Sequence, residues 1–186
     1  SPFSESSMLL STNAETFANV SISNTLPFSF LDINYEFFVG ELSKSDRIRY
    51  QGGFTSGKPI ISGVFIEMSP FEGLSLSASR LLQSGCGERG GLDFGSLWDA
   101  FFSPTTNDNT SAELSRDEEF GNQQAAIAAK YVFLNGDNPF SVYMEYAGDD
   151  TSHGDNIRLC NVAMSIGTEI PSLADGLGLV YEWTDW

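Results

Sequence analysis

The sequence predicts an all-β fold: an antiparallel up-and-down transmembrane β-barrel segment that supplies about eight or nine strands of a larger barrel. Apolar and polar residues alternate with a period of two in several short blocks. The connections between the blocks alternate between short and long. No apolar run reaches the roughly 18 residues of a membrane-spanning helix, but barrel strands need no such run because their residues face lipid and lumen in turn.

The clearest alternation lies in residues 30–39. Successive side chains of a strand point to opposite faces, so this block has an apolar face and a polar face. The apolar face holds Leu31, Ile33, Tyr35, Phe37 and Val39, and the polar face holds Asp32, Asn34 and Glu36. The blocks 140–146 and 177–184 repeat the pattern. Acidic residues in mid-strand indicate a wet face, which is either an ordinary exterior or a wet interior with lipid outside.

The expected strands follow one another along the chain. They cover residues 6–12, 17–24, 28–41, 59–69, 74–82, 124–134, 140–148, 157–167 and 176–185. Short connections at 24–27, 69–73 and 135–139 contain the Pro, Gly and Asn residues of tight turns, and 168–175 is a slightly longer turn. The long connections are 42–58, 83–123 and 149–156. All short turns therefore lie at one end, as in an outer-membrane barrel, whereas a Greek-key sandwich would mix loop lengths.

Arg80 interrupts the apolar face of strand 74–82, because it shares the parity of Leu74, Leu76 and Ala78. Two interpretations are open. Arg80 lies beyond the apolar band, or a β-bulge turns its side chain to the other face.

The loop 83–123 is too long to lack structure of its own in a compact fold. Within residues 93–102, Phe94, Leu97, Trp98 and Phe101 follow one another at helical spacing, and Asp93 is a suitable N-cap. The sequence therefore predicts one short helix in this long loop.

Composition excludes several classes of protein. Apolar residues make up 41% of the 186, which argues against disorder, and aromatic residues reach 13%, which suits strands and membrane-interface belts. The 25 acidic and 9 basic residues give a net charge of −16, which would repel nucleic acid and anionic lipid. We expect residues 1–186 to form a single partial barrel domain, truncated at both ends, since no signal peptide is visible and the strand pattern still runs at the last residues.

Several segments resemble the capsule-assembly Wzi family. They are the strand 33–42, the strand–turn–strand unit 63–80 with its Pro70 turn and Arg80 end, the Gly-rich run 85–91, Asp108-Asn109, and the run 120–123. The resemblance implies a bacterial outer-membrane β-barrel lectin with about eighteen strands, of which this chain is an internal fragment. It also implies capsular or other surface polysaccharide and outer-membrane lipid as partners, with no nucleic acid.

Catalytic signatures are weak. The single histidine, His153, lies in a polar loop that offers poor support for a catalytic triad, and no Gly-x-Ser-x-Gly elbow is present. Glycoside hydrolysis needs two carboxylates about 5–10 Å apart. Four candidates lie on polar strand faces: Glu36, Glu67, Glu145 and Glu182. Such carboxylates are equally expected in a solvated lumen, and they also accept hydrogen bonds from bound sugars. We therefore expect no enzyme, no catalytic residue and no cofactor.

Metal and disulfide sites are also weakly indicated. Asp149, Asp150, Asp155 and Asn156 form an oxygen-rich loop with some suitability for Ca²⁺, but their spacing does not match an EF-hand, and no metal is expected. Cys86 and Cys160 are expected at the same end of the barrel, where the oxidising periplasmic environment allows a disulfide. The alternative is two unbonded thiols, because Cys160 shares the apolar parity of its strand.

The expected ligand surface combines loop 83–123 with the polar strand faces next to it. Trp98 suits stacking on a sugar ring, unless it only forms the apolar side of its helix. The expected ligand-binding residues are Glu88, Arg89, Trp98, Asp108, Asn109, Asn122, Gln123 and Glu145. With so few basic residues, a neutral polymer or binding by hydrogen bonds is favoured. The interpretation is non-catalytic polysaccharide binding at the outer membrane, with a porin-like pore or a soluble β-sandwich glycan hydrolase as alternatives.

Overall fold

The computed structural model describes residues 3, 9, 16–50, 53–84, 121–134, 136, 138–151 and 159–185, and these form ten strands and no helix. The strands are β1 (Ala18–Ser23), β2 (Asn34–Glu41), β3 (Ser45–Tyr50), β4 (Gly53–Gly57), β5 (Ile60–Phe71), β6 (Leu74–Ser84), β7 (Gly121–Phe133), β8 (Phe140–Thr151), β9 (Leu159–Ala174) and β10 (Leu177–Asp185). In these ranges no helix is long and apolar enough to cross a membrane.

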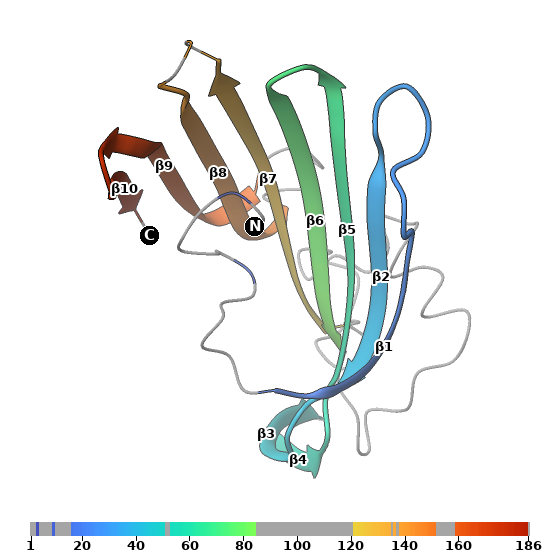
Figure 1. Cartoon of the computed structure of the whole chain (residues 1–186). Helices are drawn as coiled ribbons and strands as arrows, with labels where there is room; N and C mark the ends of the chain where they lie inside the picture. The colour runs from blue at the N-terminus through green and yellow to red at the C-terminus, as the bar shows by residue number, and fades with distance from the viewer. Residues whose placement is uncertain are drawn as a thin grey trace.

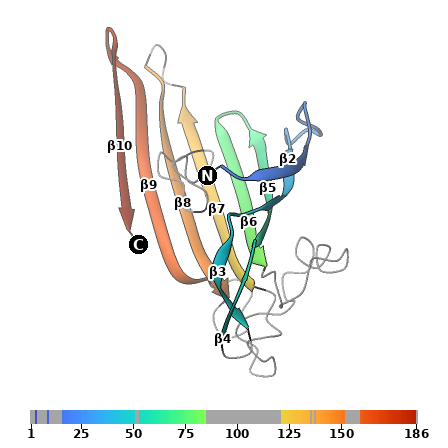
Figure 2. The same ribbon diagram turned by 90° about the horizontal axis from the view of Figure 1, so that it is seen from below.

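Eight strands form one curved sheet in the order β1-β2-β5-β6-β7-β8-β9-β10 (Figures 1 and 2). All neighbouring strands in it are antiparallel. The up-and-down order expected from the sequence is thus confirmed. The sheet is open in the described residues, with β1 and β10 as its edges, so the structure does not show a closed barrel.

Short and long connections separate to opposite ends of the sheet, as expected (Figure 1). At the short-turn end, Gly73 and Gly176 have φ of 85° and 72°, which an L side chain rarely adopts, and they close the β5–β6 and β9–β10 turns. Asn24 orders the β1–β2 connection there, because its amide donates to the Ile33 carbonyl and accepts from the Tyr35 N–H. We call the opposite end, with the connections 42–59, 85–120 and 152–158, the loop end.

Four sequence expectations need correction or lie outside the described residues. The loop 42–58 contains the β3–β4 hairpin, which pairs only with itself. The turn expected at 168–175 is mostly strand, because β9 continues to Ala174 and a register shift between Leu177 and Leu179 accommodates Pro171, which has no N–H to donate. The helix expected at 93–102 is not confirmed; that segment and strand 6–12 lie outside the described residues.

Pairing register gives the sheet two chemically different faces. One register row reads Tyr35, Ile66, Ala78, Ile127, Tyr146 and Met164, on what we call the outer face. The adjacent row reads Asn34, Glu67, Ser77, Ala128, Glu145, Ser165 and Thr184, on what we call the inner face. Ile127 is 61% exposed and Met144 46%, whereas Glu145 and Ser165 are 1% and 0% exposed. The apolar side chains are thus the bare ones, and the polar side chains are covered.

The inner face of β2, β5 and β6 carries an apolar cluster of Phe38, Ile61 and Leu81, with Phe65 packed against it. Phe38 and Phe65 stack with ring centroids 5.9 Å apart. Gly63 lies between Phe38 and Leu81 in the register, and a Cβ there would clash with the Phe38 ring. A glycine at this point therefore lets the phenylalanine lie across the neighbouring strand.

The inner face of β8–β10 repeats this arrangement with polar groups. Tyr143, Gly167 and Glu182 occupy one register row, and the Tyr143 hydroxyl donates to Glu182 Oε2 at 2.9 Å. A Cβ at Gly167 would meet the Tyr143 ring, with 2.7 Å to its Cε2 atom. The missing side chain lets the ring cross β9 and tie β8 to β10.

Arg80 remains on the outer face, because the β6–β7 register is unbroken from Leu74 to Ser84. Its guanidinium donates to Gln123 Oε1 at 2.5 Å, toward the loop end of the sheet. Of the two interpretations of Arg80, the bulge is therefore excluded.

Gly167→Ala should lower the free energy of unfolding by about 1–3 kcal/mol, because the added methyl group displaces the Tyr143 ring from its contact with Glu182. The measurement is the urea midpoint of the full-length protein in lipid vesicles. In a Tyr143→Ala background, Gly167→Ala should lower the free energy of unfolding much less. An equal cost in both backgrounds would show that the ring is not the cause.

Candidate functional site

The inner face of β7–β10 carries a set of polar contacts that span more than one strand. Lys130 of β7 reaches across β8 to Glu169 of β9, with 3.0 Å between Nζ and Oε2. The Tyr143–Glu182 bond is a second such contact near the short-turn end, so Glu169 has a cationic partner on a nearby strand and Glu182 a neutral hydroxyl donor.

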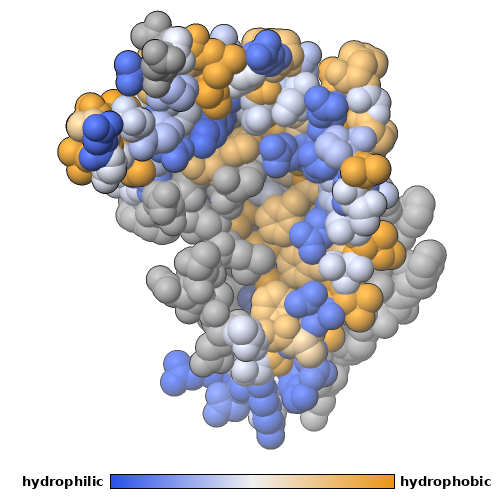
Figure 3. All heavy atoms as spheres, viewed as in Figure 1, coloured by the Kyte–Doolittle hydropathy of each residue, from blue (hydrophilic) through white to orange (hydrophobic). Residues whose placement is uncertain are grey.

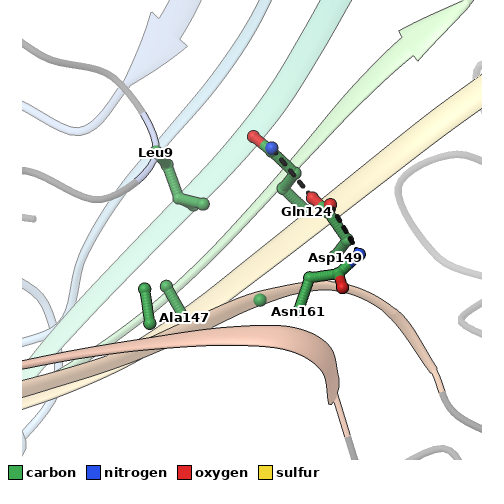
Figure 4. A pocket seen from close by; sticks show the side chains of 7 residues that line it. Leu9, Gln124, Ala147, Asp149 and Asn161 are labelled. Atoms are coloured by element: carbon green, nitrogen blue, oxygen red, sulfur yellow. Dashed lines mark hydrogen bonds between the residues drawn. The ribbon is translucent and has the colours of Figure 1, made fainter. Parts of the chain in front are cut away.

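A pocket of about 150 Å³ lies on the same face toward the loop end (Figure 4). Its polar residues are Gln124 of β7, Asp149 of β8 and Asn161 of β9, and Leu9 faces them. Gln124 Nε2 donates to Asp149 Oδ1 at 2.9 Å, and Asn161 Nδ2 donates to Asp149 Oδ2 at 3.5 Å. One carboxylate thus accepts hydrogen bonds from two side-chain amides in the lining of this pocket.

Small residues and irregular pairing create this hollow. The inner row Ser79, Ala126, Ala147 and Ala163 has no large side chain, so the wall beside Asp149 is recessed. The β8–β9 register shifts on both sides of Asp149, and Asn161 has φ of 45°. Asparagine tolerates this left-handed conformation better than most residues, and the shifts turn its side chain toward Asp149.

The pocket offers hydrogen-bonding groups of both kinds. Because Asp149 receives both amide donors, the Gln124 and Asn161 carbonyl oxygens can accept from hydroxyl groups. Leu9 supplies an apolar side. A few convergent polar groups beside an apolar surface suit a polyhydroxylated ligand.

A cation site is not assembled in the described residues, where no group of three or more His, Cys, Asp or Glu side chains gathers. Of the acidic loop considered for Ca²⁺, Asp149 lies in the pocket, whereas 152–158, with His153, Asp155 and Asn156, lies outside the described residues. Cys86 also lies outside them. Cys160 pairs with Asp149 in the β8–β9 register, and its side chain is not described.

Most of the expected ligand-binding residues lie outside the described part of the chain: Glu88, Arg89, Trp98, Asp108 and Asn109. Asn122 belongs to β7, but its side chain is not described. Gln123 is on the outer face, bonded to Arg80, and Glu145 is buried on the inner face. The structure therefore puts these two residues on opposite sides of the sheet.

Sequence reasoning passed over Gln124 and Asn161. Gln124 was detectable in principle, because it shares the parity of Ala126 and Ala128, which face inward with Glu145. The sequence pattern could not predict that Asn161 faces inward, because its direction depends on the register shifts beside Asp149.

Two of the carboxylates considered for hydrolysis, Glu67 and Glu145, lie far apart on the inner face. Glu67 and Glu145 occupy one register row, with β6 and β7 between their strands. Three interstrand spacings separate their backbones by about 14 Å, beyond the 5–10 Å of a glycosidase pair. Glu182 is engaged by Tyr143.

Comparisons with known proteins agree with the resemblance noted in the sequence. A protein of Klebsiella pneumoniae described as an uncharacterized 55.8 kDa protein in the cps region is 39% identical over 94 residues. The matched segment makes up 50% of this chain and 17% of that protein. No solved structure matches the chain significantly. The family model described as capsule assembly protein Wzi matches residues 1–185, and the chain therefore belongs to this family.

Proposed function

We propose that this chain forms part of the wall of an outer-membrane β-barrel that binds surface polysaccharide during capsule assembly, without cleaving it. Membership in the capsule-assembly family gives the biological setting. The proposal rests on one observation: the sheet exposes apolar residues on its outer face and buries polar residues on its inner face, the reverse of a water-soluble protein.

Lipid is the environment that fits the outer face. Large apolar side chains are exposed on the outer face of consecutive strands, among them Ile66, Ile127, Met144, Ile166 and Trp183. A water-soluble protein rarely leaves so continuous an apolar surface bare, because hydrating it is unfavourable. Hydrocarbon chains remove that cost, and each strand between the edges β1 and β10 is paired on both sides.

Aromatic residues mark the short-turn end of the outer face. Tyr131, Phe133 and Phe140 contact one another there, with centroid distances of 4.7 and 4.5 Å. Phe28 and Tyr35 form another such pair at 6.1 Å beside the β1–β2 connection. Aromatic girdles lie at membrane interfaces, and short turns of bacterial barrels face the periplasm. We therefore assign the loop end to the cell surface.

This orientation supports ligand contact at the loop end. The pocket of Gln124, Asp149 and Asn161 lies toward that end of the inner face. In our proposal, Glu88, Arg89, Asp108 and Asn109 of the connection 85–120 and Asn122 of β7 bind polymer hydroxyls. Trp98 stacks on a sugar ring, and Glu145 lies deeper in the wall.

Trp98→Ala in the full-length protein should weaken binding of capsular polysaccharide about five- to tenfold, the amount expected for loss of one ring stack. The measurement is binding of the polymer, purified from the source strain, to detergent-solubilised protein. The matched control is Trp183→Ala on the outer face, which should leave binding unchanged.

Three outcomes would contradict the proposal. One is wild-type protein that binds no polymer and conducts ions as an open channel in a planar bilayer, which would favour the pore. Another is release of reducing ends from the polymer, which would favour a hydrolase. The third is a gene deletion that leaves the amount of cell-bound capsule unchanged.

Met144→Arg should lower the free energy of unfolding in lipid vesicles by about 2–4 kcal/mol, because Met144 lies in mid-strand on the outer face. Leu173→Arg, the same kind of change at the β9–β10 turn, should cost at most about 1 kcal/mol. Equal, small effects at both positions would indicate water rather than lipid on this face.

A further inference from the structure

We propose that the β3–β4 hairpin, with Lys44 and Lys58 beside it, binds carboxylate groups of an acidic polysaccharide at the loop end. This inference rests on the proposed function and adds to it the chemical class of the polymer and the element that selects it.

Basic residues concentrate in this hairpin. Residues 44–58 hold Lys44, Arg47, Arg49 and Lys58, which are four of the nine bases of the chain, and one acid, Asp46. The segment carries a net charge of +3, whereas the other 171 residues carry −19. Figure 3 shows a strongly hydrophilic group of side chains at the end where Figure 1 places β3 and β4. An anionic polymer repelled by most of the chain is thus attracted to this segment.

The hairpin is fastened to the main sheet where the two meet. A two-stranded hairpin alone is marginally stable, so it needs such support. The Leu42 N–H donates to the Pro59 carbonyl at 2.8 Å, and Lys58 Nζ forms an ion pair with Glu41 Oε1 at 2.5 Å. Ile48 is buried, which gives the hairpin an apolar anchor. The basic residues are therefore presented by an attached element.

Of the four bases, Lys58 is engaged within the chain, Lys44 and Arg47 are exposed, and the side chain of Arg49 is not described. The hydrogen bond from Lys58 to Glu41, together with the charge of that carboxylate, raises the pKa of Lys58, so its ammonium stays protonated and occupied. Lys44 and Arg47 are exposed, and no carboxylate in the described residues pairs with either. These two cations are available for an external anion.

Phe54 favours a sugar carboxylate as that anion. It is 67% exposed on β4, where it pairs with Arg49 of β3 in the register. On a segment rich in cations, an exposed aromatic ring offers a stacking surface for the apolar face of a sugar, and the cations offer charge for its acid group. The hairpin extends beyond the end of the main sheet rather than along its apolar outer face (Figure 1), which favours a polymer over lipid phosphates.

The test compares Lys44→Gln/Arg47→Gln with a control that has the same net charge. The control is Asn138→Asp/Ser172→Glu, which changes exposed residues at the short-turn end. The probes are capsular polysaccharide purified from the source strain and the same polymer after chemical reduction of its carboxyl groups. Binding to detergent-solubilised, full-length protein is measured at low and physiological salt.

The glutamine variant should bind native polymer about tenfold more weakly at low salt, with a smaller loss at physiological salt, and the control should bind like wild type. Carboxyl reduction should abolish the difference between the variant and wild type. The hairpin inference is overturned if the variant binds like wild type, if both variants lose affinity equally, or if the polymer holds no carboxylate. Vesicles that contain lipid A serve as a further probe. The hairpin inference is also overturned if the variant loses affinity for these vesicles and not for the polymer.

These results are distinguishable from failure of the proposed function itself. If the wild-type protein binds both forms of the polymer equally and the variant does too, polysaccharide binding stands and the hairpin inference fails. If the wild-type protein binds neither form, both fail. Retention of capsule by cells that carry the glutamine variant provides a second readout.

Discussion

The pairing register of the sheet is the constraint on which the rest of this structure depends. Each strand of the eight-stranded sheet pairs with its sequence neighbours in that sheet, and the register carries apolar residues to the outer face and most polar residues to the inner face. A slip of β8 by one residue would turn Glu145 to the outer face, beside Ile127 and Met164. Because both faces are chemically distinct along most strands, the register is specified twice, once by each face.

Two glycines let aromatic rings lie across neighbouring strands on the inner face of the sheet. Gly63 and Gly167 lie on the inner face, and each leaves room for an aromatic ring from the preceding strand of the sheet, Phe38 in one case and Tyr143 in the other. The first ring belongs to an apolar cluster, and the second ends in a hydrogen bond to Glu182. The same glycine–aromatic contact thus occurs in the apolar part of the inner face, on β2, β5 and β6, and in its polar part, on β8–β10.

Much of the fold could be predicted from the sequence because the period-two pattern is local. The strands of the main sheet, their order and the separation of short from long connections follow from it. The strand expected at 28–41, however, begins at Asn34, because Ser29 and Asp32 have φ of 65° and 49° in a turn. The β3–β4 hairpin was missed because Arg47, Arg49 and Gly53 show no apolar alternation. The end of β9 was missed because Pro171 and Gly176 indicate a turn, whereas the register shift admits the proline. The polar pocket depends on register shifts and on Asn161, which no sequence pattern reports.

Charge shows the same limit of sequence reasoning. A net charge of −16 argues for a neutral ligand if the charge is treated as evenly spread. In salt solution, however, exposed charges more than about 8–10 Å apart are largely screened from one another, so an approaching polymer responds to the nearest groups. Lys130 is paired with Glu169 on the inner wall, and Arg80 lies on the outer face, where it is bonded to the neutral Gln123. Lys44 and Arg47 are exposed in segment 44–58, whose net charge of +3 is opposite in sign to that of the whole chain.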